Sequence, residues 1–320
     1  MRILRFEKYG TPDVLQLEEV REPEPGADEV LIHIKAAGIN PSDIKNVAGQ
    51  FHSPIPRIPG RDFAGVVAGG GAEIGLDVWG SGPGFGVLRD GAHAEYITMP
   101  VEWIAKKPVS LSMEQAAAVG VPYLTAWSAL VQAGGLESGE TVLIVGVSGA
   151  VGRAATQIAH WKGARVIGAS TSAHNPSGAD AVIDTTAGQL DVEVRALTDG
   201  KGVDLVLDAV GGRMFEPALR SLHAGGRQIA ITTSVDRKVS FDLIDFYRNR
   251  LHLIGVNTMV LTGVETVEML NGLRQGFDEG YLHPPEVLAW PLERAVEAYE
   301  VVARGGTRVK HVLIPHPTAE

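Results

Sequence analysis

The sequence predicts an α/β protein with a β-rich part and a doubly wound parallel sheet. Strand-like runs broken by Gly and Pro dominate residues 1–118. From 119 to 257, near-continuous apolar runs alternate with helical stretches, which is the pattern of βαβ units. After residue 257 the chain returns to helices and ends in one more strand-like run. We therefore expect one domain built from 1–118 and 258–320, with the parallel-sheet domain, 119–257, inserted between its two parts.

The composition excludes several classes of protein. The chain has 320 residues, of which 45% are hydrophobic and 21% charged, as in ordinary soluble globular proteins. Its net charge of −10 argues against nucleic acid or an anionic membrane as a partner. The absence of cysteine excludes disulfides, thiolate zinc sites and a cysteine nucleophile. No signal-like N-terminus and no apolar run of about 18 residues is found, so we expect a cytoplasmic protein with no membrane partner.

The strands of the β-rich part are recognised by alternation and by the breakers that bound them. Residues 29–39, 63–70 and 94–100 are the strand candidates, and 309–315 supplies the last one. Glycine is so dense in 72–92 that we expect loops there.

The parallel-sheet part begins with a run of apolar residues, 139–147, as expected of a strand buried on both faces. A helix follows over 150–163, where Gly163 is a plausible C-cap. The further strands expected in this part are 164–170, 179–185, 203–212, 225–232 and 251–257. Two helices, 263–276 and 292–306, come after it.

The turn between the first of these strands and its helix carries glycines at 146, 149 and 152. A strand before it, a helix after it and a second strand within about 30 residues make it a candidate dinucleotide-binding turn. Backbone N–H groups and the helix dipole would then bind the pyrophosphate. The candidate cofactor contacts are Gly146, Ser148, Gly149, Ala150, Val151 and Gly152. The alternative is that the glycines only let the helix pack closely on the strand.

The end of the second strand discriminates between NAD and NADP. An acidic residue there would bind the ribose 2′-hydroxyl and repel a 2′-phosphate. The sequence instead offers Ser170, Thr171 and Ser172, and its first acid, Asp180, comes too late. These hydroxyls favour NADP, although no Lys or Arg lies between 165 and 195 to pair with the phosphate.

Several segments together resemble the medium-chain dehydrogenase/reductase superfamily, in its zinc-independent quinone oxidoreductase branch. The resemblance runs over nearly the whole chain, and its carriers are "GINPSDIKNVAG" (38–49), "IPGRDFAGVV" (58–67), "GAHAEY" (91–96), "AAAVGVPYLTAWSAL" (116–130), "VLIVGVSGAVG" (142–152), "GVDLVLDAVGG" (202–212) and "VKHVLIP" (309–315). It implies a GroES-like catalytic domain, a Rossmann domain, NADPH as cofactor and a homodimer formed through the Rossmann sheet edge.

The resemblance also implies that zinc is not used. The zinc-dependent alcohol dehydrogenases of this superfamily carry Cys in the first motif and Gly-His-Glu in the second. This chain has Asn40 at the first position and Arg61-Asp62 at the others, and neither amide nor guanidinium replaces thiolate or imidazole around zinc. We therefore expect no metal, and hydride transfer to a quinone or an α,β-unsaturated carbonyl compound, which needs no Lewis acid.

By the same resemblance, Asn40 lies beside the nicotinamide ribose, with Asp43 in the same turn. The alternatives are an Asx turn before Pro41 and a helix cap. Thr125 resembles a threonine near the nicotinamide, or is a core residue. Tyr123 faces the acceptor as a proton donor, or only packs.

Further cofactor contacts are expected where the parallel strands end, because ligands bind at the carboxyl edge of such sheets. The candidates are Val210, Gly211, Thr232, Thr233, Val256 and Asn257. Each is otherwise an ordinary strand end. Lys310 resembles a lysine near the cofactor, or is solvated.

Two other functions remain open on these residues. One is an enoyl-thioester reductase. The other is a non-catalytic NADPH-binding structural or regulatory protein, since function depends on the site and not on the fold.

Overall fold

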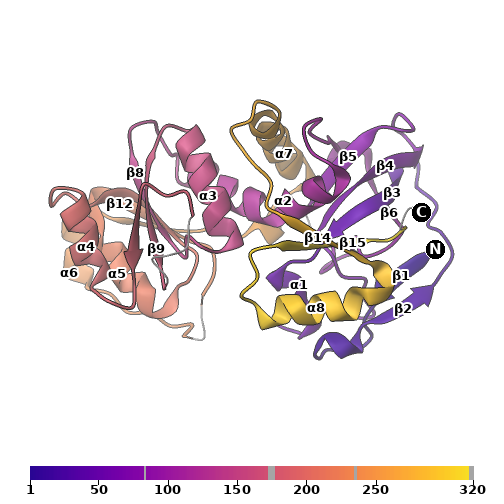
Figure 1. Ribbon diagram of the computed structural model, residues 1–320, viewed down its shortest axis with the longest axis horizontal. Helices are drawn as coiled ribbons and strands as arrows, with labels where there is room; N and C mark the ends of the chain where they lie inside the picture. The colour runs from indigo at the N-terminus through magenta and orange to yellow at the C-terminus, as the bar shows by residue number, and fades with distance from the viewer. Residues whose placement is uncertain (83, 172–176, 234–235, 317–320) are drawn as a thin grey trace. The chain divides into compact units, whose positions relative to one another are not determined.

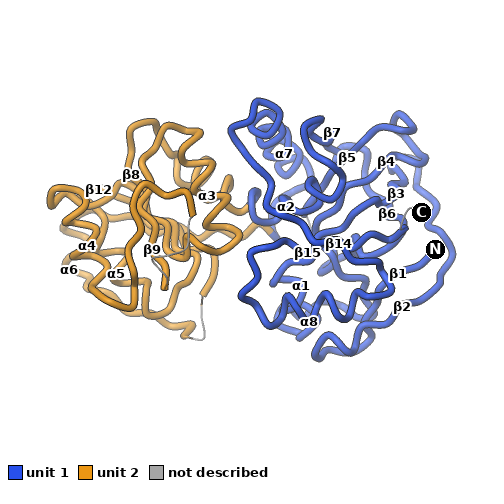
Figure 2. The backbone as a smooth tube through the Cα atoms, in the orientation of Figure 1, with its two compact units in different colours: residues 1–124, 259–320 blue, residues 125–258 orange. Residues whose placement is uncertain are grey.

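The computed structural model describes residues 1–82, 84–171, 177–233 and 236–316. The chain separates into two compact units (Figure 2). Unit 1 comprises Met1–Leu124 and Met259–Glu320, and unit 2 comprises Thr125–Thr258. Both ends of the chain therefore belong to unit 1.

Unit 1 is built on a seven-stranded mixed sheet (Figure 1). Its central strand, β3 (Glu29–Gly38), pairs antiparallel with its neighbours, and its alternating sequence places Val30, Ile32 and Ile34 in the core. The other strands of the sheet are β4 (Asp62–Gly70), β5 (Asp77–Ser81), β6 (Tyr96–Pro100), β7 (Ala105–Lys106), β14 (Val287–Pro291) and β15 (Lys310–Ile314). A separate pair, β1 (Arg2–Arg5) and β2 (Gln16–Glu19), completes the strands.

One of these strands was not expected from the sequence. Strand β5 crosses the glycine-rich segment 72–92, which the sequence predicted to be loops, so that prediction is wrong for residues 77–81. Gly80 in this strand is required by packing, because a Cβ there would come within 2.4 Å of the Phe63 ring. Gly80 contributes to the glycine-rich composition that predicted a loop, but in the structure it lets the Phe63 ring lie against the strand.

Among the described residues, four α-helices belong wholly or mainly to unit 1. They are α1 (Pro41–Val47), α2 (Met113–Trp127), α7 (Gly263–Asp278) and α8 (Ala295–Arg304). Helix α8 contributes Ala298 and Tyr299, both fully buried, to a core shared with Phe6 and Leu313.

Helix α2 runs on into a π-helical turn, Ser128–Ala133. The combined segment, Met113–Ala133, has a mean hydropathy of 1.2 over an 18-residue window, which meets the criterion for a membrane span. The sequence analysis expected no stretch apolar enough to span a membrane, and this expectation is corrected. The few polar residues of Met113–Ala133 do not lower its mean hydropathy below the value typical of a span. Since 67% of that window is buried within the protein, the helix is equally typical of a buried core helix.

Unit 2 contains a six-stranded sheet in which every pairing is parallel. In spatial order its strands are β10 (Ala181–Asp184), β9 (Arg165–Ser170), β8 (Thr141–Val145), β11 (Val203–Asp208), β12 (Leu222–Ala230) and β13 (His252–Gly255). Residues 142–145 of the central strand β8 are all buried, as its continuous apolar run predicts.

Helices flank this sheet, with α3 on one side of β8 and β9 and α4, α5 and α6 on the other (Figure 1). Their bounds are α3 Ala150–Trp161, α4 Leu190–Leu197, α5 Phe215–Arg220 and α6 Leu243–Arg248. A mixed sheet in one unit and a doubly wound parallel sheet in the other confirm the predicted α/β class.

Candidate active site

The turn between β8 and α3 is shaped by its glycines. Gly146 has a left-handed φ of +84°, and Gly149 is the N-cap of α3. A Cβ on Gly152 would lie 2.4 Å from the Gly146 carbonyl oxygen and 2.6 Å from the Val147 Cα. Only glycine fits at position 152, because the helix begins directly against the preceding turn.

The same turn presents the open end of a helix. Gly149 and Ala150 are exposed, and none of the described side chains caps the first N–H groups of α3. Such groups have no partner within the helix and lie at the positive end of its dipole, so they suit a pyrophosphate. The predicted residues Gly146 to Gly152 are therefore brought together in a form that fits a dinucleotide.

The end of β9 lies beside this turn. The Ser170 hydroxyl donates to the Ser148 hydroxyl at 3.2 Å, and Thr171 is exposed. Ser172 lies outside the described residues. Asp180 is far from this end, because its carboxylate accepts from the backbone N–H of Val166, near the start of β9. Asp180 is thus not placed at the end of the strand where a ribose-binding acid would stand.

A cation that the sequence reasoning missed adjoins the turn. Arg153, in the first turns of α3, donates through its guanidinium to the Ser148 carbonyl oxygen at 3.1 Å. The sequence-based expectation considered only cations that follow the start of β9, whereas this arginine follows Gly152 directly. Its position in the motif is the signal that could have identified it.

The ends of β11 and β12 meet next to the same turn. A Cβ on Gly211 would lie 2.8 Å from the Thr233 Cα, and one on Gly146 would lie 2.9 Å from a Val210 methyl carbon. The loop after β11 is held by Asp208, which accepts from the N–H groups of Val210 and Gly211 at 3.0 and 2.8 Å. Asp208 was not predicted as a site residue; burial raises the pKa of its carboxyl.

For the remaining predicted cofactor contacts of unit 2, the structure gives their exposure and, for Val256, one backbone hydrogen bond. Val256 donates from its backbone to Ala230 at the end of β12, and Asn257 is exposed. Thr232 is exposed next to Thr233, and Thr125 is half-buried in α2.

A polar cluster in unit 1 surrounds Asn40, the N-cap of α1. Its side-chain nitrogen donates to Asp62 at 2.8 Å, and its backbone N–H donates to Asp43 at 2.7 Å. Its side-chain oxygen accepts from the Lys310 ammonium. Because ammonium only donates and carboxylate only accepts, these partners determine the orientation of the amide. The structure thus brings Asn40, Asp43 and Lys310 into one network.

Asp62, the first residue of β4, is the centre of that network. It is fully buried, and it accepts from Asn40, from the Ser81 hydroxyl at 2.5 Å and from the Val121 N–H at 3.0 Å. A Cβ on Gly120 would lie 2.3 Å from its carboxylate. The sequence reasoning considered Asp62 only as a lost metal ligand, but it joins β4, β5 and α2 around Asn40.

Burial perturbs the ionisable groups of this cluster. It raises the pKa of the Asp43 carboxyl to about 7, and the Asp62 carboxylate nearby acts in the same direction. It lowers the pKa of the Lys310 ammonium from its usual value, against the opposing effect of the two carboxylates. Groups with such perturbed pKa values are typical of functional sites.

A buried histidine supports the backbone that precedes Asn40. Burial lowers the pKa of His93 to about 4, so its ring is neutral. One ring nitrogen donates to the Gly38 carbonyl oxygen at 3.2 Å, and the other accepts from the Tyr299 hydroxyl at 2.7 Å. Helix α8 is thereby tied to the end of β3.

Tyr123 packs against α7 and the segment that follows it. Its hydroxyl donates to the His283 carbonyl oxygen at 2.6 Å, and its ring lies against Phe277 at a centroid distance of 5.1 Å. A role as proton donor would require this hydrogen bond to be exchanged.

The donor set of the Asn40 cluster does not fit zinc. Zinc takes thiolate, imidazole and carboxylate ligands. Of Asn40, Arg61 and Asp62, only Asp62 is such a donor, and its oxygens already accept from three groups. Nowhere in the described ranges do three or more His, Cys, Asp or Glu side chains gather in a way that could hold a metal ion.

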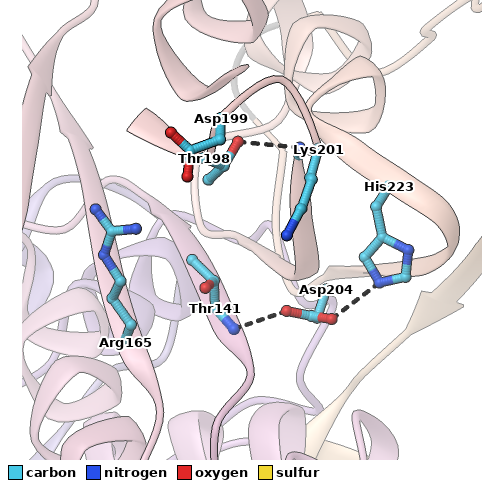
Figure 3. A pocket seen from close by; sticks show the side chains of 8 residues that line it. Thr141, Arg165, Thr198, Asp199, Lys201, Asp204 and His223 are labelled. Atoms are coloured by element: carbon cyan, nitrogen blue, oxygen red, sulfur yellow. Dashed lines mark hydrogen bonds and ion pairs between the residues drawn. The ribbon is translucent and has the colours of Figure 1, made fainter. Parts of the chain in front are cut away.

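A pocket in unit 2 lies at the opposite end of the strands from the dinucleotide turn. Thr141 and Arg165, the first residues of β8 and β9, line it. Asp199 and Asp204 are its acidic residues, and Figure 3 shows Asp204 bound between the Thr141 N–H and the His223 ring, at 2.8 and 2.9 Å. This pocket is therefore separate from the candidate cofactor site.

Comparison with known proteins shows which proteins this chain resembles. Residues 26–109 match the alcohol dehydrogenase GroES-like domain, and residues 150–270 match the zinc-binding dehydrogenase family. A zinc-type alcohol dehydrogenase-like protein of Schizosaccharomyces pombe is 36% identical over 288 residues, covering 88% of this chain and 86% of that protein. The quinone oxidoreductase of Homo sapiens is 29% identical, over 98% of both chains. The crystal structure of Escherichia coli quinone oxidoreductase complexed with NADPH superimposes with a TM-score of 0.85 at 26% identity, covering 98% of this chain and all of that one.

The chain therefore belongs to the medium-chain dehydrogenase/reductase superfamily, as the motifs predicted. Within it, the chain falls in the quinone oxidoreductase-like branch. It is an oxidoreductase that uses a nicotinamide dinucleotide and acts on a small molecule.

Proposed function

We propose that this protein reduces a quinone or an α,β-unsaturated carbonyl compound with NADPH and without a metal ion. The observation that carries the proposal is the Asn40 cluster. Asn40 and Asp62 occupy motif positions where zinc-dependent relatives carry Cys and Glu, and the Lys310 ammonium donates to the Asn40 amide. Quinones and enones suit this donor set, because the charge that arrives with a hydride spreads onto a carbonyl oxygen. Hydrogen-bond donors are then enough to stabilise it.

We assign the dinucleotide to the turn after β8. When bound, its nicotinamide supplies the hydride. The open N-terminus of α3 supports binding of the pyrophosphate at Gly146, Ser148, Gly149, Ala150, Val151 and Gly152. The ends of the neighbouring strands, with Thr125, remain the proposed contacts for the rest of the cofactor: Val210, Gly211, Thr232, Thr233, Val256 and Asn257.

NADPH is proposed over NADH on two observations. The described end of β9 offers the hydroxyls of Ser170 and Thr171 where an NAD-binding protein has an acid. No Lys or Arg follows β9 closely enough to pair with a 2′-phosphate, but Arg153 supplies a positive charge from α3. Its guanidinium and the Ser170 hydroxyl both contact Ser148. A guanidinium pairs well with a phosphate because its donors form a planar fork. Ser172 belongs to the same proposal.

Asn40, Asp43 and Tyr123 remain the proposed catalytic residues. Asn40 can orient groups through its amide because both of its ends are held. Asp43, with a pKa of about 7, can hold or release a proton near neutral pH. Tyr123 is a proton donor only if it releases the His283 carbonyl.

The proposal is tested by mixing the protein with NADPH and a panel of quinones, enones and crotonyl thioesters, and following loss of the reduced nicotinamide. Turnover of quinones or enones above thioesters is expected. Faster turnover of thioesters would favour the enoyl-thioester reductase instead. Tight NADPH binding with no turnover of any acceptor would favour a structural or regulatory protein.

We also propose a cytoplasmic homodimer that forms through the free edge of β13. This strand ends the sheet, and Leu253 on it is 38% exposed, while Leu243 and Tyr247 on α6 are 64% and 57% exposed. Light scattering of the purified protein should give twice the chain mass, and Leu253→Glu should give the monomer. A monomeric wild-type protein at micromolar concentration would refute the dimer.

A further inference from the structure

The residues around Asn40 do not fit the zinc ion that the family description of a zinc-binding dehydrogenase implies. They do include a cation of the protein itself, the Lys310 ammonium. We propose that the Lys310 ammonium is the built-in cation of this site, which stabilises the oxyanion that develops on the acceptor and then gives it a proton. The inference rests on the reductase function proposed above and names the group that takes over the role of a metal in it.

The ammonium of Lys310 is held in place. Lys310 is the first residue of β15, and its nitrogen donates to the side-chain oxygen of Asn40. That amide is itself held by Asp62, which is fully buried. A cation whose partner is fixed in this way needs no reorganisation when charge develops, which is the condition for strong electrostatic stabilisation.

The groups of the cluster differ in exposure. Asp62, Asp43 and Asn40 are 0%, 1% and 2% exposed, whereas Arg61 and Lys310 are 5% and 9% exposed. Of these five residues, Lys310 has the most exposed surface. An ammonium has three N–H donors, and the Asn40 oxygen takes one of them, so donors remain for an acceptor oxygen.

The ammonium is also more acidic than that of a solvated lysine. Burial lowers the pKa of Lys310, so it gives up a proton more readily. The charged and titratable groups that act on it or respond to it are Asp43 on α1, Arg61 and Asp62 at the start of β4, His93 before β6, and His311 beside it on β15. The two acidic residues raise the pKa of Lys310, and Arg61 lowers it.

The proposed step conserves atoms and charge. The acceptor takes up a hydride with its two electrons, and an electron pair moves onto the carbonyl oxygen. A proton passes from the Lys310 nitrogen to the resulting enolate or quinol anion. The neutral amine then takes a proton from water. The net reaction consumes one NADPH, one proton and one acceptor, and it yields NADP⁺ and the reduced acceptor.

The test compares Lys310→Met with Lys106→Met, in which an exposed lysine of β7 in the same unit is removed. We expect kcat of Lys310→Met to fall about a hundredfold or more, in line with loss of a general acid. The rate is measured at saturating NADPH, and the dissociation constant of NADPH is measured by fluorescence titration, so that a weaker cofactor contact is not counted as a loss of kcat. Lys106→Met should match the wild type in both measurements.

The pH profile separates this role from a merely structural one. Wild-type kcat should fall at alkaline pH as Lys310 deprotonates, and this limb should be absent from Lys310→Met. Lys310→Arg keeps the charge but does not release a proton, so it should recover only part of the rate. Should the Met variant fail to fold by circular dichroism, Lys310→Gln is measured in its place, because its amide keeps a polar N–H donor at this position but carries no ammonium proton.

The outcomes are distinct. Wild-type turnover that persists within about twofold in the folded variant, or an alkaline limb that survives the substitution, would overturn the role of Lys310 and leave the reductase function standing. A wild-type protein that reduces no acceptor would overturn the reductase function and the inference with it.

Discussion

The ammonium of Lys310 donates a hydrogen bond to the side-chain oxygen of Asn40, a residue 270 positions earlier in the chain. The contact is a consequence of sheet pairing. Strand β15 lies antiparallel to β3, with Val312 opposite Gly38, and the Ile39 N–H donates to His311 at 3.0 Å. The two ends of unit 1's sequence therefore meet at the residues that carry the proposed chemistry.

Asp62→Asn should damage both stability and activity. An amide in place of the carboxylate presents N–H groups to some of the donors that Asp62 now accepts, from Asn40, Ser81 and Val121. We expect a loss of about 3 kcal/mol in the free energy of unfolding, as for breaking a buried charged network, and a lower kcat. Asp28→Asn, at an exposed carboxylate, should change neither. Denaturant unfolding measures the first effect, and an unchanged midpoint would contradict the role of Asp62.

Gly152→Ala should abolish dinucleotide binding. The added Cβ would lie 2.4 Å from the Gly146 carbonyl oxygen, so either the turn or the start of α3 must move. Gly69→Ala, on β4, is the matched control, because a Cβ there would meet only the Leu31 Cβ at 3.9 Å, an ordinary contact distance. Fluorescence titration with NADPH should show binding in the control alone. Equal affinities in the two variants would argue against the turn as the pyrophosphate site.

Arg153→Met should shift the preference between the two dinucleotides. Removing the guanidinium near Ser148 should weaken NADPH about tenfold or more and leave NADH nearly unchanged, because only NADPH carries the 2′-phosphate. Lys162→Met, at the other end of the same helix, should alter neither affinity. Equal losses for both dinucleotides would show that Arg153 supports the turn without reading the phosphate.

Asp43 should make the protein less stable as pH rises. Its pKa of about 7 in the folded state exceeds the ordinary value of 3.8, so the folded state holds the proton more tightly than the unfolded state. Its contribution to stability is therefore complete below about pH 4 and is lost as pH rises through about 7. Thermal unfolding at about pH 5 and about pH 8 should show a smaller decrease in Asp43→Asn than in the wild type or Asp28→Asn. An identical decrease in all three would contradict the shifted pKa.

The strand, glycine turn and helix over residues 141–161 were predictable from the sequence because their signal is local. The glycines at 146, 149 and 152 follow a buried strand and begin a helix, and this short-range order determines the geometry. The α/β class was predictable for the same reason, since hydrophobic periodicity specifies strands and helices one at a time. Which strands end beside the turn followed from the rule for parallel sheets.

Some residues of the Asn40 network could be predicted from the sequence, but the contacts between them could not. The resemblance pointed to Asn40, Asp43 and Lys310, but their contacts depend on pairing between distant strands, which periodicity does not report. Asp62 was missed as a structural centre because its partners come from three separate segments. Strand β5 was missed because Gly80, which a packed ring requires, looks like a loop residue in composition.

The central claim is that NADPH reduces a quinone or enone on this protein without a metal. The most direct measurement is steady-state oxidation of NADPH by such acceptors with metal-free protein, prepared with a chelator and checked by elemental analysis. The account predicts turnover that is unchanged when zinc is added and lower with NADH than with NADPH. Activity that appears only after zinc is restored, or no oxidation with any quinone or enone, would contradict it.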